Sequence, residues 1–293
     1  MSQRIAVITD SNSGITQDQA QQMGIGVVPM PFRINDVEYF EEIDLSQKQF
    51  YEKLAGDETI TTSQPSPASL MEIWDLALKD HDQVVYLPMS SGLSCSCQTA
   101  KMLAKDYDGK VQVVNNQRIS VTQRNSVTDA LYLAGQGKNA EEIRIILEEE
   151  KFNSTIYITL DTLYYLKKGG RITPAAAALG TLLKIKPVLQ IQGEKLDAFR
   201  KARTMTAAKA TMIAAVKADL DNRLTPKGTP YENAPVCIGV AHTNCEEEAQ
   251  ALMEELKTIF PQAAEYCIAP LALSIACHTG PGALGIAATR LVR

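Results

Sequence analysis

Residues 83–105, QVVYLPMSSGLSCSCQTAKMLAK, decide the fold of the N-terminal half. The apolar run 83–89 predicts a buried strand, the serine- and glycine-rich residues 90–94 predict a tight loop, and residues 95–105 predict a helix. The same order of strand, polar loop and helix occurs at the start of the chain, from residue 5 onward. This alternation is typical of a parallel sheet with helices on both faces.

Further elements of the N-terminal half follow from local signals. Thr16 is placed to cap a helix over residues 17–23. Ser46 begins a capping box, and Ser66 precedes a proline that suits the first position of another helix. Residues 25–33 are apolar enough to predict one further strand.

The C-terminal half predicts a mixed sheet with helices. A hairpin is expected on either side of Gly193, and a long helix over residues 205–223. The sequence therefore indicates two α/β domains, residues 1–155 and 156–293, with a ligand tunnel between them. The segments 175–191 and 271–287, rich in Ala, Leu and Ile, are candidate tunnel walls.

Composition narrows the class of protein. The chain has 293 residues, of which 45% are hydrophobic and 22% are charged, as in an ordinary globular protein with a real core. The net charge of −5 argues against general nucleic-acid binding, which needs a basic face. A signal-peptide pattern and an apolar run of membrane-spanning length are both missing, so we expect a cytoplasmic protein with reduced thiols.

Four turns combine hydroxyl groups or glycines in a way that suits anion binding. They are residues 61–66, 90–94, 169–171 and 278–283. Neutral hydroxyls offset the desolvation of an oxyanion without adding charge, so these turns predict a receptor for a carboxylate or a phosphate. Phosphate-loop, dinucleotide and H-E-x-x-H patterns are missing, and neither a metal nor a cofactor is expected.

Each candidate side chain also has a structural interpretation. Ser94 suits the cap of the helix that follows it, and Thr62 suits a turn. A lone histidine such as His278 is more often structural than functional. Arg171 and Arg203 are equally explained as solvated surface charges.

Taken together and in order, a set of segments spanning nearly the whole chain resembles the DegV family of bacterial fatty-acid-binding proteins. These segments are ITDS at 8–11, TSQPS at 62–66, SSGLS at 90–94 with QTA at 98–100, YLKKGGRI at 165–172, IKPVL at 185–189, Arg203, and HTGPGA at 278–283.

The resemblance implies a protein that holds a long-chain fatty acid, such as palmitate, stearate or oleate, without catalysis of its own. It implies that the hydroxyls of Thr62 and Ser94 contact the carboxylate. Its further ligand-binding candidates are Ser63, Ser91, Arg171, His278 and Gly280. A carboxylate beside His278 is expected to favour the protonated imidazole.

The resemblance also implies that some members present the carboxylate to a separate ATP-dependent kinase, which forms an acyl phosphate. Arg171 and Arg203 are the candidates for that partner or for phosphoryl transfer, and transient contact with a membrane surface is a further expectation. The chain departs from the family pattern at Cys95 and Cys97, and at Asn115 and Asn116. These changes bear on acyl-chain preference and on the kinase partnership.

Two other functions stay open from the sequence. The first is a hydrolase or phosphotransferase with Ser94 or His278 as nucleophile, although no histidine–acid relay to Ser94 is recognisable. The second is an interaction module for a kinase, with Arg171 and Arg203 on its docking face.

Overall fold

The structure is a computed structural model that describes residues 3–41, 43–56, 58–179, 185–193 and 195–293. The chain divides into two compact units, the first comprising Met1–Phe152 with Arg293 and the second comprising Asn153–Val292. Part of the candidate wall 175–191, residues 180–184, lies outside the described residues.

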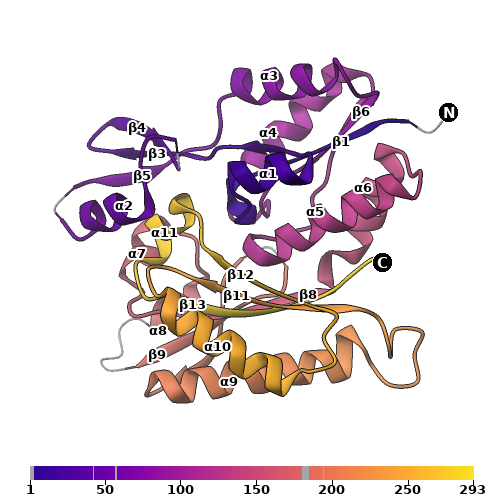
Figure 1. The fold of residues 1–293 in the computed structure, drawn as a ribbon. Coiled ribbons are helices and arrows are strands. Elements are labelled where there is room, and N and C mark those ends of the chain that lie inside the picture. Colours follow the sequence, from indigo (N-terminus) through magenta and orange to yellow (C-terminus); the bar gives the residue numbers. More distant parts are fainter. Residues whose placement is uncertain (1–2, 42, 57, 180–184, 194) are drawn as a thin grey trace. The chain divides into compact units, whose positions relative to one another are not determined.

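The first unit is built on a parallel sheet, as the sequence predicted (Figure 1). Its four strands follow the order β2-β1-β6-β7. Their bounds are β1 Ile5–Asp10, β2 Gly26–Val28, β6 Gln83–Leu87 and β7 Val111–Val113. Because β1 connects to β2 on one side and β6 connects to β7 on the other, the strand order reverses between β1 and β6.

Helices cover both faces of this sheet (Figure 1). The helices are α1 Gln17–Met23, α3 Pro67–Ala77, α4 Ser96–Leu103, α5 Ser120–Gly135 and α6 Ala140–Glu149. On one face, Ile8 and Tyr86 pack with Trp74 of α3 and Ala100 of α4 in a buried apolar cluster. The neighbouring strand residues point the other way, toward α5 and α6.

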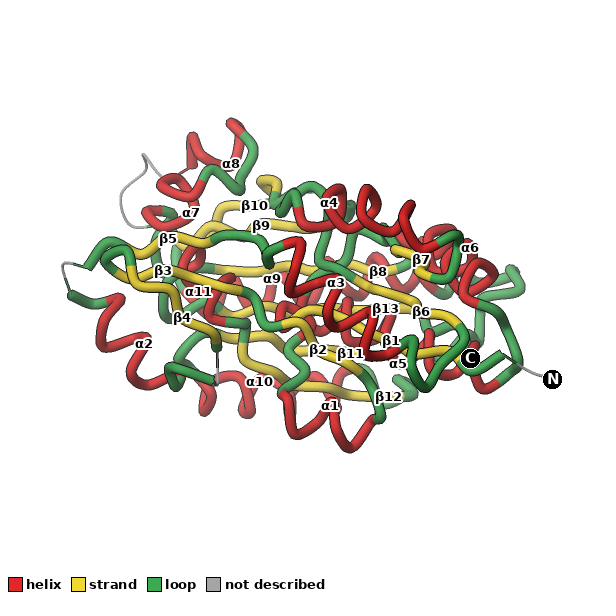
Figure 2. The backbone as a smooth tube through the Cα atoms, turned by 90° about the horizontal axis from the view of Figure 1, so that it is seen from above, coloured by secondary structure: helices red, strands yellow, loops and turns green. Residues whose placement is uncertain are grey.

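A small antiparallel sheet completes the first unit. It has the order β4-β3-β5, and the three strands lie side by side in both views (Figures 1 and 2). Their bounds are β3 Pro31–Ile34, β4 Val37–Phe40 and β5 Ile60–Thr62, and the helix α2 Gln47–Leu54 precedes β5. Phe32 of β3 packs edge-on against Phe50 of α2, with ring centroids 5.5 Å apart.

The second unit contains a six-stranded mixed sheet in the order β10-β9-β8-β13-β11-β12. Only the β11–β12 pair is parallel among these five pairings of described strands. The bounds are β8 Ser154–Thr159, β9 Lys186–Ile191, β10 Asp197–Ala202, β11 Val236–His242, β12 Glu265–Pro270 and β13 Leu284–Arg290.

Two long helices, α9 Met205–Asp219 and α10 Glu246–Ile259, pack on one face of the second sheet (Figure 1). Met212 and Leu252 of these helices join Ile238 and Ile286 of the strands in one apolar cluster. Three short helices are α7 Tyr164–Gly169, α8 Pro174–Leu179 and α11 Leu273–Thr279. Of these, α7 and α11 pack against each other.

The α/β class is confirmed, and so are the helices at residues 17–23 and after Ser66, each with its predicted cap. The single strand predicted over residues 25–33 is wrong. It is split into β2 and β3, which belong to different sheets, because prolines at positions 29 and 31 lack the N–H that a continuous ladder needs. The turn predicted at Thr61–Thr62 is also wrong, since both residues end β5.

Candidate functional site

The serine loop, residues 90–94, follows the carboxyl end of β6, where the order of the parallel sheet reverses. Ligands of open parallel sheets bind in the crevice at such a switch point. Ser90 is fully buried, donates its N–H to the Arg118 carbonyl at 2.8 Å, and accepts at its carbonyl from the Ser94 N–H at 3.2 Å. The backbone of the loop is thereby fixed, with Ser91 and Ser94 only half-buried.

The prediction that Ser94 caps the following helix is wrong, because the N-cap of α4 is Cys95, which makes no side-chain hydrogen bond there. The Ser94 Oγ instead accepts a hydrogen bond from the Ser96 N–H at 3.1 Å, in the turn just before the helix. A hydroxyl that accepts in this way still has its own proton to donate, so this bond and a ligand contact are compatible. Among the described residues no histidine is found hydrogen-bonded to this hydroxyl, the bond that activates a serine nucleophile.

The end of β5 brings Thr62 and Ser63 toward the same helix. Thr62 is half-buried and pairs with Phe32 of β3, while the Ser63 side chain is exposed. The next residue, Gln64, accepts a hydrogen bond at its Oε1 from the Thr99 hydroxyl of α4 at 3.0 Å. This bond joins the segment that carries Thr62 to the helix that begins just after Ser94.

A buried polar network, which the sequence pattern did not predict, lies next to the serine loop. The Asp10 carboxylate accepts from the Met89 N–H at 2.8 Å and from the Gln123 side-chain amide at 3.0 Å. It also accepts from Asn12. Burial raises the pKa of Asp10, while these hydrogen bonds act to lower it. The motif ITDS contains Asp10, but nothing local marks Gln123, which lies 113 residues away in sequence.

The C-terminal unit groups Gly169, Arg171 and His278. A Cβ atom on Gly169 would collide with the His278 imidazole, so the missing side chain is what allows the ring to lie against α7. Arg171 donates from its guanidinium to the Gly169 carbonyl. Gly280 has a φ of 71° and faces the Tyr165 ring in the same way. Both glycines therefore allow a close approach between α7 and the C-terminal end of α11 with the residue after it.

The surroundings of His278 disfavour the protonated imidazole. Burial, and secondly the Arg171 guanidinium, lower the pKa of His278 to about 4. The expected protonated imidazole therefore requires an anion beside it, because a negative charge would oppose both causes.

Arg203 is placed differently from Arg171. It follows β10, is exposed, and makes no ion pair within the described part of the chain. Thr62, Ser63, Ser91 and Ser94 belong to the first unit, whereas Arg171, Arg203, His278 and Gly280 belong to the second. Their convergence on one ligand stays a prediction.

The departures from the family pattern have separate structural roles. Cys95 is exposed just before α4, while Cys97 is buried in the apolar cluster of the first sheet, where burial raises the pKa of its thiol to about 11. Asn115 donates its N–H to Glu148 at 2.9 Å, and the buried Asn116 donates to the Ser126 hydroxyl at 2.6 Å. Cys97 and Asn116 thus belong to the core, whereas Asn115 is half-buried and Cys95 is exposed.

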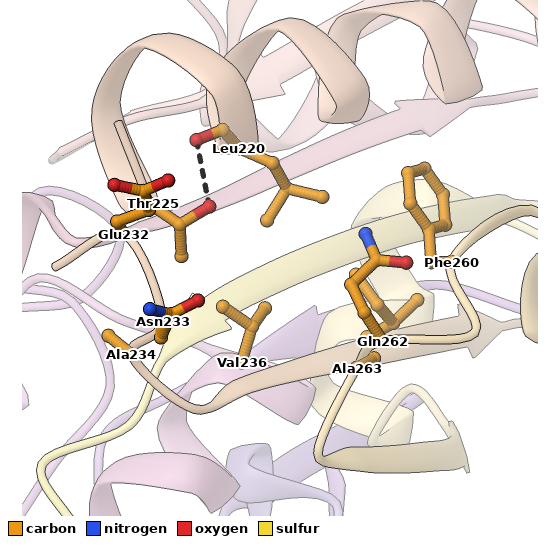
Figure 3. A pocket seen from close by; sticks show the side chains of 10 residues that line it. Leu220, Thr225, Glu232, Asn233, Ala234, Val236, Phe260, Gln262 and Ala263 are labelled. Atoms are coloured by element: carbon orange, nitrogen blue, oxygen red, sulfur yellow. Dashed lines mark hydrogen bonds between the residues drawn. The ribbon is translucent and has the colours of Figure 1, made fainter. Parts of the chain in front are cut away.

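A cavity of about 170 Å³ lies elsewhere in the C-terminal unit (Figure 3). Apolar side chains such as Leu220, Val236 and Phe260 meet Glu232 and Gln262 there. The full lining is Leu220, Thr225, Glu232, Asn233, Ala234, Val236, Ile238, Phe260, Gln262 and Ala263. None of the predicted site residues lines it.

The described residues hold no group of three or more His, Cys, Asp or Glu side chains arranged to bind a metal ion. They also hold no helix with the length and apolar character to cross a bilayer.

Comparison with known proteins decides the family. A family model described as "Uncharacterised protein, DegV family" matches residues 4–291. The chain belongs to the DegV family. Among curated DegV relatives, Protein DegV of Bacillus subtilis is 32% identical over 285 residues, which cover 96% of this chain and 98% of the relative. A DegV domain-containing protein of Clostridium acetobutylicum is 32% identical over 289 residues, which cover 97% of this chain and 96% of the relative.

Solved DegV structures share the fold along the whole chain. A DegV family protein from Thermus thermophilus, described by its fatty acid binding, superposes with a TM-score of 0.88 at 30% identity, covering 98% of this chain and 100% of that one. The Bacillus subtilis DegV structure, described as a fatty acid binding protein, superposes with a TM-score of 0.85 at 31% identity, covering 99% of this chain and 100% of that one. The resemblance seen in the sequence is thereby confirmed at the level of family and fold.

Proposed function

We propose that this chain binds a long-chain fatty acid non-covalently and has no catalysis of its own. The observation that carries the proposal is the end-to-end likeness to two DegV structures described as fatty acid binding, at 30% and 31% identity. The hydroxyl-bearing segments of the first unit and the glycine-lined histidine of the second give that ligand chemically suitable partners.

The hydroxyls of Thr62 and Ser94 would hold the carboxylate, with Ser63 and Ser91 beside them. A carboxylate that leaves water needs donors, and hydroxyls supply them without a competing charge. The geometry supports this role in two ways: Ser94 keeps a proton to donate while its Oγ accepts from the Ser96 N–H, and the Gln64–Thr99 bond holds the two segments together.

His278, Arg171 and Gly280 would form the second side of the head-group site. The neutral imidazole can donate one hydrogen bond to a carboxylate, and the arriving charge would raise its pKa. Arg171 adds a permanent positive charge next to the ring. The bare backbone at Gly280 permits close approach.

The acyl tail would supply most of the affinity. At about 0.8 kcal/mol per buried methylene, a chain the length of palmitate gains on the order of 12 kcal/mol before the costs of ordering. A hydrogen bond to the charged head group adds about 1.5–3 kcal/mol. The tail therefore sets affinity for palmitate, stearate or oleate, and the hydroxyls set orientation.

An apolar sheet face in the second unit is the candidate wall for that tail. Successive strand residues point to opposite faces, so the residues next to those packed under α9 and α10 lie on the other face. On that other face, Ile156, Ile158, Leu189, Ala241 and Ala287 are all buried.

The protein would present the bound carboxylate to a separate kinase. That enzyme would transfer the terminal phosphoryl group of ATP to a carboxylate oxygen, giving the acyl phosphate and ADP. The exposed Arg203 is available for such a partner. The Arg203→Ala variant should bind palmitate normally but lower acyl phosphate formation in the presence of kinase. Loss of palmitate binding would instead place Arg203 in the pocket.

Uptake of so insoluble a ligand would involve transient contact with a membrane surface. In α7, Tyr164 is 61% exposed, and Lys167 and Lys168 are exposed beside it. An aromatic ring with adjacent lysines suits an anionic bilayer interface.

Denaturing extraction of the purified protein, followed by lipid mass spectrometry, tests the proposed function. About one acyl chain per protein, or uptake of added palmitate to that ratio, is expected. The absence of both co-purified lipid and palmitate uptake would refute the proposed function. A serine-reactive phosphonate distinguishes the hydrolase alternative from non-catalytic binding, since a covalent adduct on Ser94 would support an enzyme instead.

A further inference from the structure

Thr243 is a fully buried residue that holds the turn after α11 by four hydrogen bonds. It follows directly after β11. Its N–H donates to the Ala283 carbonyl at 2.9 Å, and its carbonyl accepts from the Gly282 N–H at 2.7 Å. Its hydroxyl donates to the Gly280 carbonyl at 2.6 Å and accepts from the Ala283 N–H at 2.8 Å.

The turn that Thr243 holds, residues 280–283, begins two residues after His278. Gly280 and Gly282 have φ values of 71° and 76°, which side chains other than glycine rarely adopt. A Cβ on Gly282 would collide with the Asp161 carboxylate, which pairs with Lys186 at 2.5 Å. The turn is therefore confined by packing as well as by hydrogen bonds.

We propose that Thr243 is a positioning residue for the head-group site, because its hydroxyl fixes the turn that ends α11 and thereby keeps His278 against Gly169 and beside Arg171. The proposal rests on the proposed function for the ligand, while the position of the imidazole is testable without one. Thr243 acts through His278 and is assigned no contact with the fatty acid.

The hydroxyl is suited to this role because it donates and accepts at once. Valine has nearly the same shape but can do neither, so it would leave the Gly280 carbonyl and the Ala283 N–H without this buried partner. Serine keeps both hydrogen bonds. The charged groups around the turn are Arg171, Asp161 and Lys186, and none is altered by these substitutions.

The experiment compares Thr243→Val, Thr243→Ser and the control Thr289→Val. Thr289 is also fully buried, in β13, but its hydroxyl makes no hydrogen bond among the described residues. The first readout is the titration midpoint of His278 by NMR in lipid-free protein. The second is the dissociation constant for palmitate.

In Thr243→Val the His278 midpoint should rise from about 4 toward 6.5, because the ring leaves its buried place beside Arg171. Palmitate binding should weaken about tenfold, as expected for the loss of buried hydrogen bonds that orient the site. Thr243→Ser should keep both values near those of wild type, and Thr289→Val should change neither.

An unchanged His278 midpoint in Thr243→Val would overturn the proposal, whatever the change in stability. If that variant does not fold, Thr243→Cys replaces it, since a thiol is a weaker donor and acceptor and should give an intermediate midpoint. In Thr243→Cys, a His278 midpoint equal to that of wild type would likewise overturn the proposal. If wild-type protein takes up no palmitate, the proposed function fails, while the lipid-free titration still decides the role of Thr243.

Discussion

The protonation of His278 should make the lipid-free protein sensitive to mild acid. Burial, with Arg171 as the second cause, lowers the pKa of His278 from 6.5 to about 4. The unfolded chain has the ordinary value, so between pH 6.5 and pH 4 it binds more protons than the folded protein. The contribution of His278 to stability is therefore complete above pH 6.5 and is lost as the pH falls toward 4. Over this gap of about 2.5 pH units, at 1.36 kcal/mol each, the loss approaches about 3 kcal/mol.

Urea unfolding of lipid-free wild type and of His278→Gln, at intervals from pH 7.5 to pH 4.5, measures this loss. Wild type should lose more of its free energy of unfolding than the variant, with the excess confined to the range below pH 6.5. The comparison is needed because burial also lowers the pKa of His242, which both proteins retain.

The account of His278 is refuted if the two stability curves run parallel throughout this range. A second arm uses saturating palmitate. A carboxylate beside the imidazole raises its pKa, so the excess loss should shrink in the complex. An excess loss that stays the same with palmitate bound would show that the head group lies elsewhere.

Three variants test the site directly. Arg171→Gln should raise the His278 midpoint in an NMR titration, because the guanidinium is one of the two causes that lower its pKa. Gly169→Ala should displace the imidazole and weaken palmitate binding, since its Cβ would overlap the ring. The double variant Thr62→Ala with Ser94→Ala removes two hydrogen bonds to a charged group and should lose about 3–6 kcal/mol of palmitate binding by calorimetry, less than the gain from the tail.

Each of these has a control or a contradicting result. Gly135→Ala is the matched control for the glycine substitution, because it lies in α5 with nothing within 4 Å of an added Cβ and should stabilise the protein by up to ~1 kcal/mol. Equal effects of the two alanines would mean that the ring is not held against Gly169. For Arg171→Gln an unmoved midpoint contradicts the stated cause, and for the double variant the contradiction is an unchanged affinity with an unchanged ligand pose.

Local signals in the sequence were enough to place most helices. Thr16 and Ser66 each cap a helix as predicted, because capping chemistry acts within three residues. The helix α11 was not predicted within the apolar run 271–287. It has only seven residues, and Ala272 at its N-cap makes no side-chain hydrogen bond, so no local signal marks its start.

Features that depend on distant residues could not be predicted in this way. The serine loop was expected from its composition, but the Asp10–Gln123 bond beneath it spans 113 residues. The place of His278 depends on bare glycines in α7 and on a threonine that ends another strand. Such pairings are fixed by tertiary packing and leave no periodic pattern in the sequence.

A crystal structure of the protein with bound palmitate tests the central claim most directly. We expect the palmitate carboxylate within hydrogen-bond distance of the Thr62 and Ser94 hydroxyls, with the His278 imidazole on the same head group and the tail in an apolar tunnel. A carboxylate in solvent, or bound by other side chains while these three lie apart from it, would contradict the account.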